Sequence, residues 1–438
     1  MSSLESLKQS HPSFGPEAQE PEWLTARRQA GLARFAELGF PSTKSEAWKY
    51  SSTRRLDDAG FVHHTGPVDA EVLERVAASR LADAAAELVF VDGRYAPELS
   101  RVADGAVTAR PLSDVAMDAS LNLDDVLGKV AKDASAPFLA LNDAFLQDGL
   151  LVHAPRLAEL DGLIHVLHII RGDVQPLAAH PRVVVLAETG SRVSVAESFV
   201  GLGAHPTLIN AITELSVGAG ARVDHALLGV EGEGLHVVVG VSASLSRDAT
   251  LSSHTAWLGT GWARADLHIT LSGPGAQATM DGLEVLGRTQ HADTRLLIEH
   301  AVPHTSSAQG YKGVLGGRAR GVFDGKVVVH EGASGTQAAQ RFDHILLSED
   351  ADGNARPQLE IYHDDVKCSH GTTIGQLDAT QLSYLRSRGI PKTQAARMLT
   401  EAFVADRVLA ARHPVWRAHL DRLVGERMHT VLDAEAAS

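Results

Sequence analysis

Short, strand-like apolar runs separated by glycine-containing turns dominate the sequence between residues 136 and 378. Examples are residues 183–187, 193–196, 237–241 and 327–329. The turns GSRV at Gly190, GARV at Gly220, RDATL at Arg247 and GAQATM at Gly275 recur at intervals of roughly 27–30 residues, a period typical of solenoids. No long helical pattern separates the runs, which argues against a doubly wound α/β sheet. We predict a mainly β chain whose core is a parallel β-helix, with a β-sandwich as the alternative.

Helical patterns flank this core on both sides. One helix is predicted between Pro21 and Gly39, and a second over residues 70–87. An apolar run that meets Asp92 and Gly93 predicts a hairpin. We therefore divide the chain into a disordered leader (1–20), a mainly helical N-terminal region (21–135), the β-helix core (136–378) and a helical C-terminal region (379–438).

Charge and cysteine content restrict the classes of binding partner and the cellular location that we expect. The formal net charge is -14 and no basic stripe occurs, so nucleic acid is not an expected partner. Cys368 is the only cysteine, so the chain cannot form an internal disulfide. The first ten residues lack the pattern of a signal peptide, and the apolar stretches are too short to span a bilayer. We expect a cytoplasmic protein that does not bind membranes.

Motifs for enzyme activity are absent from the sequence. There is no G-x-x-x-x-G-K-[ST] phosphate loop, no H-E-x-x-H, no C-x-x-C and no G-x-S-x-G. The chain is therefore expected to have no catalytic activity and no ATPase activity of its own.

One segment, IYHDDVKCSHGTTIGQLD at residues 361–378, concentrates reactive side chains. If it is extended, Cys368 and His370 project to the same face, because side chains alternate along a strand. A thiolate beside an imidazole suits a soft or borderline metal, and a nearby imidazolium would lower the thiol's pKa. The alternatives are a buried cysteine beside a surface histidine and a Cys-His hydrolase. An iron–sulfur cluster usually needs about four ligands, mostly thiolates, so this chain cannot hold a cysteine-ligated cluster alone.

The C-terminal region contains an apolar helical stripe. Its residues are Ala395, Met398, Leu399, Ala402 and Phe403. The stripe either docks a partner or covers the open end of the solenoid.

The segment PQLEIYHDDVKCSHGTTIGQLD (357–378), followed by LSYLRSRGI (382–390), closely resembles the C-terminal signature of the SufD branch of the SufB/SufD family of iron–sulfur cluster assembly proteins. SEAWKYSS (45–52), LVFVDGRYAPELS (88–100) and PFLALNDAFLQDGLLVHAP (137–155) agree more weakly. The similarity extends from about residue 20 over nearly the whole chain. His363 departs from the pattern, where a small residue is expected, and its role stays open.

The resemblance implies a right-handed parallel β-helix between helical terminal regions. It implies a heterodimer with SufB through the β-helices, a homodimer when the chain is isolated, and docking of the ATPase SufC on the C-terminal helices through Leu399, Ala402 and Phe403. His370, with Cys368 beside it, would lie at the SufB interface and help to bind iron or a transient iron–sulfur cluster; no cofactor would be held by this chain alone. The sequence leaves two other hypotheses: a β-helix enzyme acting on polysaccharide, and a stand-alone metal-binding protein suggested by the 22 histidines.

Overall fold

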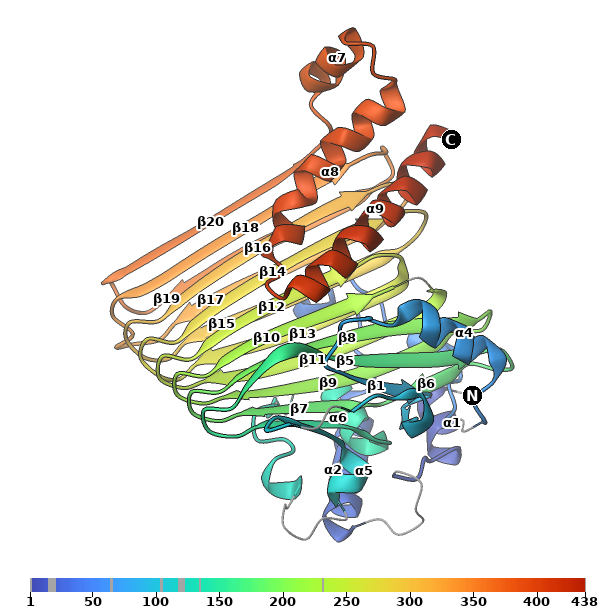
Figure 1. Cartoon of the computed structure of the whole chain (residues 1–438), viewed down its shortest axis with the longest axis vertical. Helices are drawn as coiled ribbons and strands as arrows, with labels where there is room; N and C mark the ends of the chain where they lie inside the picture. Colours follow the sequence, from blue (N-terminus) through green and yellow to red (C-terminus); the bar gives the residue numbers. More distant parts are fainter. Residues whose placement is uncertain are drawn as a thin grey trace.

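The computed structural model describes residues 2–14, 21–63, 66–102, 105–116, 123–133, 135–230 and 232–437. Two ten-stranded sheets, here called sheet I and sheet II, face each other along the length of the core (Figure 1). From β7 (Arg182–Ala187) onward, consecutive strands alternate between the sheets, and each pairs in parallel with the strand one coil away. This is a parallel β-helix, as predicted, because the sheets of a β-sandwich would be antiparallel.

The coils turn at a corner where one residue adopts a left-handed backbone conformation. Gly190, Gly220, Asp248, Gly275 and Gly335 occupy this position, with φ between 57° and 79°. Each donates its N–H to a carbonyl of the next coil at 2.8–3.1 Å. Glycine adopts positive φ without strain, which explains why the predicted turn positions recur with the length of one coil.

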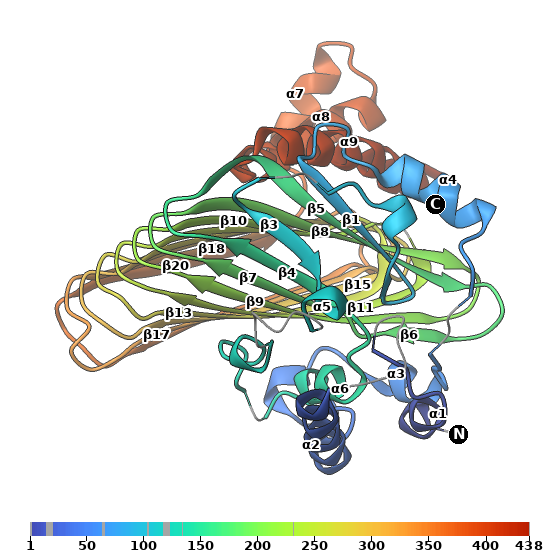
Figure 2. The same cartoon turned by 60° about the horizontal axis from the view of Figure 1, so that its bottom comes forward.

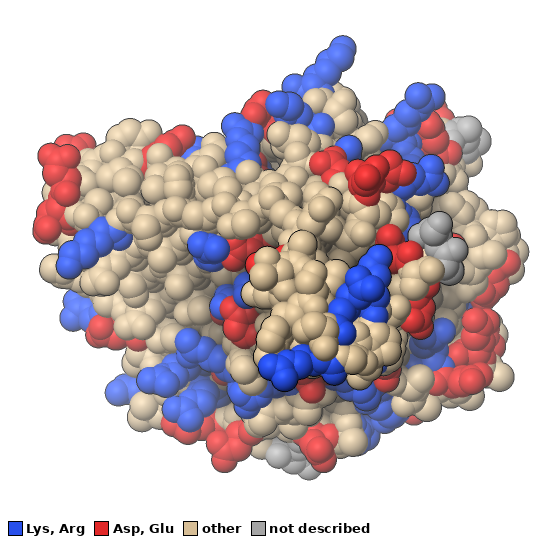
Figure 3. All heavy atoms as spheres, turned by 90° about the horizontal axis from the view of Figure 1, so that it is seen from above, with Lys and Arg blue, Asp and Glu red and all other residues tan. Residues whose placement is uncertain are grey.

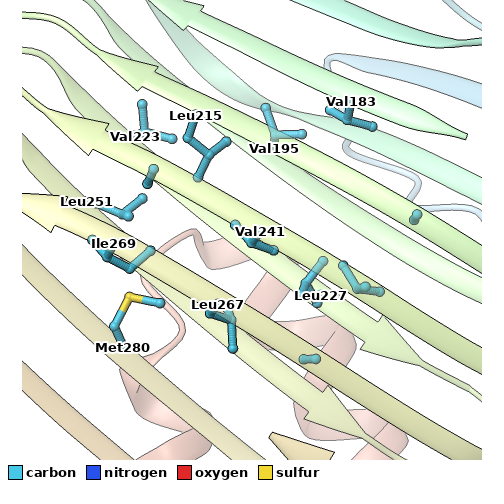
Figure 4. Packing of buried hydrophobic residues seen from close by; sticks show 14 of the residues in the cluster. Val183, Val195, Leu215, Val223, Leu227, Val241, Leu251, Leu267, Ile269 and Met280 are labelled. Carbon is cyan, nitrogen blue, oxygen red and sulfur yellow. The ribbon is translucent and has the colours of Figure 1, made fainter. Parts of the chain in front are cut away.

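Alternating aliphatic residues from the two sheets fill the space between them. Figure 4 shows Val195, Val223 and Leu251 from sheet I facing Leu215 and Val241 from sheet II. Each is almost completely buried, so stacked coils form one continuous core.

The N-terminal helices α1 (Ser3–Gln9), α2 (Glu22–Leu38), α3 (Arg54–Asp58) and α6 (Pro137–Phe145) lie together on the outer face of sheet II (Figure 2). The helix α4 (Ala70–Ser79) packs instead on sheet I. Leu7, Phe35 and Phe138 contact this face in one buried cluster with Trp48. The Arg264 guanidinium of sheet II lies 3.8 Å from the centre of a Trp48 ring. The cluster attaches the N-terminal region to the solenoid.

Three expectations for the N-terminal half were wrong. Residues 3–9 form a helix capped by Ser2, and Leu7 is fully buried, whereas 1–20 was expected to be disordered; residues 15–20 lie outside the described part. The helix expected over 70–87 ends at Ser79, because the following residues turn into a buried strand that joins sheet I. The core was expected from residue 136, yet residues 137–145 are helical and the earlier strands β1 (Ala86–Val91) and β3 (Thr108–Pro111) already belong to the sheets. The hairpin at Asp92 and Gly93 is confirmed.

The C-terminal helices α8 (Lys392–Ala410) and α9 (Pro414–Ala437) lie along the outer face of sheet I (Figure 1). They cover β12 (Thr250–Trp257), β14 (Gln277–Leu286) and β16 (Ser306–Leu315). Trp416, Leu420 and Met428 are buried against this face. Lys312 Nζ donates to the carbonyl of Phe403 at 2.8 Å, and a nitrogen of Arg427 donates to that of Val285 at 3.1 Å. The expectation that the stripe covers the open end is therefore wrong: the helices cover a side of the solenoid.

The helices are α1 (Ser3–Gln9), α2 (Glu22–Leu38), α3 (Arg54–Asp58), α4 (Ala70–Ser79), α5 (Leu112–Ala116), α6 (Pro137–Phe145), α7 (Ala379–Ser387), α8 (Lys392–Ala410) and α9 (Pro414–Ala437), with 3-10 turns at Glu46–Trp48, Pro97–Leu99 and Leu123–Asp125. Sheet I contains β1 (Ala86–Val91), β2 (Arg94–Tyr95), β5 (Glu159–Gly172), β8 (Arg192–Gly203), β10 (Arg222–Gly229), β12 (Thr250–Trp257), β14 (Gln277–Leu286), β16 (Ser306–Leu315), β18 (Thr336–Leu346) and β20 (Val366–Gly375). Sheet II contains β3 (Thr108–Pro111), β4 (Gly149–Ala154), β6 (Leu177–Ala179), β7 (Arg182–Ala187), β9 (Thr207–Val217), β11 (Gly232–Leu245), β13 (Thr260–Leu271), β15 (His291–His300), β17 (Arg320–Val329) and β19 (Asp352–Ile361). None of the helices described in these ranges has the length and apolar character needed to cross a membrane.

Candidate functional site

The last coil leaves the C-terminal end of the solenoid open. Its strands β19 and β20 are the terminal strands of the two sheets, so each pairs along one edge only. Every residue of both strands is exposed or only half-buried. Seen from above (Figure 3), the part of the molecule formed by the last coils, at the left, is mainly uncharged, with acidic and basic side chains at its margins. Unpaired strand edges around an uncharged end are suited to pairing with another chain.

Cys368 and His370 lie on the inner face of β20. Cys368 pairs in register with Ala338, which is part of the aliphatic core, and it packs at the edge of that core. His370 pairs with the buried Gln340, and its imidazole is exposed at the open end. The prediction that the two side chains share a face is confirmed.

The environment of Cys368 does not activate its thiol. Partial burial raises the thiol's pKa, and a hydrogen bond donated by the backbone N–H of Ala338 offsets this only in part. Residues two apart on a strand lie about 6.6 Å apart along it, and His370 is not among the groups that shift the thiol's pKa. The expectation of a thiol pKa lowered by an imidazolium was wrong. A protonated thiol argues against the Cys-His hydrolase.

The acidic residues next to the pair do not complete a metal site. His363, Asp364 and Asp365 lie in the turn between β19 and β20, and His363 is half-buried there. Among the residues that the structure describes, no group of three or more His, Cys, Asp or Glu side chains is arranged to hold a metal ion. His370 could contribute one ligand, and further ligands would have to come from another molecule.

Sequence reasoning missed two buried amides directly beneath His370. Gln309 and Gln340 precede His370 in one column of paired residues that runs through β16, β18 and β20. Both face the interior and are almost completely buried. The 31-residue and 30-residue gaps between the three match the length of a coil, but only the register places them in one column.

The residues predicted to dock a partner form a second, separate surface. Ala402 and Met398 are exposed on α8, while Leu399 and Phe403 are half-buried. Phe403 packs against the cluster under the helices, with the ammonium of Lys312 4.7 Å from the centre of its ring. The preceding helix α7 has no buried residue. The apolar stripe thus contributes to packing on one side and remains available on the other.

Comparison with known proteins adds the family context. The SufBD N-terminal region matches residues 16–166, and the SufBD core domain of the SUF system for FeS cluster assembly matches residues 168–403. The chain is similar to the iron–sulfur cluster assembly protein SufD of Escherichia coli, with 30% identity over 97% of each chain. It is also similar to SufD of Bacillus subtilis, with 25% identity over 90% of this chain and 91% of the relative. A SufBD family protein of Synechocystis is 29% identical over 88% of this chain and 87% of the relative.

Proposed function

The chain belongs to the SufBD family of iron–sulfur cluster assembly proteins, and from this premise we propose that it is the SufD-type subunit of an assembly scaffold. In this proposal it pairs with a SufB-type subunit through the open end of its solenoid, in the cytoplasm. The observation that carries the proposal is the uncovered last coil, whose unpaired edges surround Cys368 and His370. A strand of a partner can extend either sheet by main-chain hydrogen bonds.

The cluster itself is the product that passes through the interface. A cysteine-ligated cluster needs about four ligands, and this chain has one cysteine, so the partner must supply most of them. The exposed imidazole of His370 is the strongest ligand or proton carrier that the inner face of β20 offers. Membership of the family gives no support to a polysaccharide-active enzyme or a stand-alone metal-binding protein.

Placing a charge on the inner face of the last coil should prevent pairing. Thr372 is exposed and lies in register with the core residue Phe342, so Thr372→Arg would put a guanidinium into the apolar centre of the interface. Burial of that unpaired charge should weaken pairing by about 3 kcal/mol, roughly 100-fold in Kd. Sedimentation of the chain with its SufB-type partner measures this.

The matched control is Ser369→Arg, because Ser369 is exposed on the other face of the same strand. Both variants should melt at the temperature of the unmodified chain. Equal Kd values for the two variants would refute pairing through the open end.

We further propose that α7 and the free side of α8 dock the SufC-type ATPase, which would supply the ATP hydrolysis that this chain lacks the phosphate loop to perform. The apolar side chains available there include Met398 and Ala402, and Tyr384 of α7 is 59% exposed. Helix-to-surface contacts concentrate their energy in a few apolar anchors. Leu399 and Phe403 would support this surface from beneath.

Ala402→Asp should separate docking from stability. The carboxylate would face the docked ATPase and cost about 2 kcal/mol, roughly 30-fold in Kd, because a charge replaces apolar contact. The matched control is Ala418→Asp on α9, an exposed alanine whose replacement carries the same loss of helix propensity. Phe403→Asp, in contrast, should lower the melting temperature as well. Calorimetry with the SufC-type protein measures the Kd, and unchanged affinity of Ala402→Asp would contradict docking on α8.

A further inference from the structure

The interior of the solenoid is mostly apolar, but a column of polar side chains runs through its last coils to the open end. Gln309 and Gln340 are each 3% exposed and stand in the same column of sheet I as His370. Burying an amide costs free energy unless its hydrogen bonds are made. The hydrogen bonds that the two amides make therefore decide whether the cost of their burial is offset.

The orientation of the Gln340 amide is fixed by a carbonyl. Gln340 Nε2 donates to Gly325 O at 3.1 Å and to Gln309 Oε1 at 3.1 Å. Because a backbone carbonyl can only accept, the atom that faces Gly325 O must be the nitrogen. A Cβ at position 325 would lie 3.0 Å from Gln309 Oε1 and 2.5 Å from the Phe323 ring, so glycine is required for this approach.

The other end of the amide is unsatisfied. Gln340 Oε1 is buried and accepts no hydrogen bond from the described residues. A buried acceptor without a donor is costly, so a donor brought within reach would be bound. The next residue along the column is His370, on a strand about 4.8 Å away, and its imidazole carries such a donor.

We propose that Gln340 is a positioning residue for His370. When a partner covers the open end, the imidazole turns inward and donates one ring N–H to Gln340 Oε1. This hydrogen bond orients the ring and selects one tautomer, which leaves the other nitrogen unprotonated and free to bind iron or to accept a proton. The inference rests on the proposed function of His370 and adds the residue that orients its imidazole.

The test compares two isosteric changes in the same column. Gln340→Met removes the acceptor, while Gln309→Met removes an equally buried amide one coil deeper and leaves Gln340 attached to Gly325. The chain, labelled with 15N-histidine, is studied in complex with unlabelled SufB-type and SufC-type partners. The signals of His370 are identified by their loss in His370→Asn.

Gln340→Met should shift the tautomer ratio of His370 about fivefold, the worth of one hydrogen bond, and slow cluster assembly accordingly. Gln309→Met should leave both unchanged, although both variants lower the melting temperature. An unchanged ratio in Gln340→Met, or an equal shift in both variants, would overturn the inference. If His370→Ala stops assembly while Gln340→Met has no effect, only this inference fails. If His370→Ala assembles clusters at full rate, the proposed role of His370 fails and takes the inference with it.

Discussion

Replacing His370 with Ala is expected to reduce cluster assembly on the order of 100-fold, the usual loss when a ligand or proton carrier is removed. The imidazole is exposed at the open end, so its removal should change stability by less than about 0.5 kcal/mol. Cys368→Ala should have a much smaller effect, because burial raises the pKa of its thiol and keeps it protonated. Growth of a strain that lacks its own SufD gene, under iron limitation, measures both variants.

The control for this experiment is His363→Ala. His363 lies in the turn before β20, outside the inner face that carries His370. Reconstitution of clusters on the purified complex distinguishes lost assembly from lost pairing, because the His370 variant should still bind its SufB-type partner. Full growth of the His370→Ala strain would remove His370 from the mechanism.

Acidification from pH 7.5 to pH 5.5 is expected to lower the free energy of unfolding by about 1.4 kcal/mol for each histidine that folding keeps neutral. Burial lowers the pKa of His236, His254, His300 and His419 to about 4, and burial with nearby arginines lowers that of His63 and His291 to about 3. Burial also lowers the pKa of His180 well below its usual value. These seven histidines stay neutral in the folded chain at pH 5.5, while in the unfolded chain they bind protons below pH 6.5. The unfolded state therefore gains protons first, and stability falls as the pH drops from about 6.5 toward 4. Each histidine contributes about 1.4 kcal/mol per pH unit in this window.

Urea unfolding at several pH values measures this slope. His254→Gln removes one of the seven groups and should reduce the slope by about a seventh, while the exposed His205→Gln should leave it unchanged. Glu197 contributes to the pH dependence of the free energy of unfolding only at lower pH. Burial would raise its pKa, but hydrogen bonds from His168 and His225 outweigh burial and lower it to about 2. Its contribution is lost only below about pH 4.5, so a stability curve that stays flat down to that pH would contradict the histidine explanation.

Features that recur in each coil can be predicted from the sequence. Features that depend on contacts between residues far apart in the chain cannot. Gly190, Gly220 and Gly275 mark corners because positive φ restricts the residue type, and this leaves a visible signal. The helix expected over 70–87 was too long because Glu87 looks like a residue of a helix surface, yet it is fully buried with His165 at 3.0 Å. No local pattern reveals that pairing.

The candidate site likewise has some features that could be predicted from the sequence and others that could not. The shared face of Cys368 and His370 follows from strand alternation and could be predicted. The position of Gln340 beneath His370 could not, since it depends on a coil length that varies along the chain. The helical stripe near Phe403 was recognised, but its partner surface was not, because an apolar stripe does not specify whether it meets a sheet face or an open end.

The helices that lie along sheet I also restrict how such a chain can evolve. A solenoid can gain or lose a whole coil without disturbing its neighbours, because each coil contacts only the next. Here α8 and α9 are tied to several coils at once, through His254 with the carbonyl of Arg407 at 2.9 Å, Lys312 with that of Phe403, and Arg427 with that of Val285. Deleting the coil that holds β14 would leave these attachments out of step by one strand spacing, about 4.8 Å. The helices thus fix the number of coils between β12 and β16.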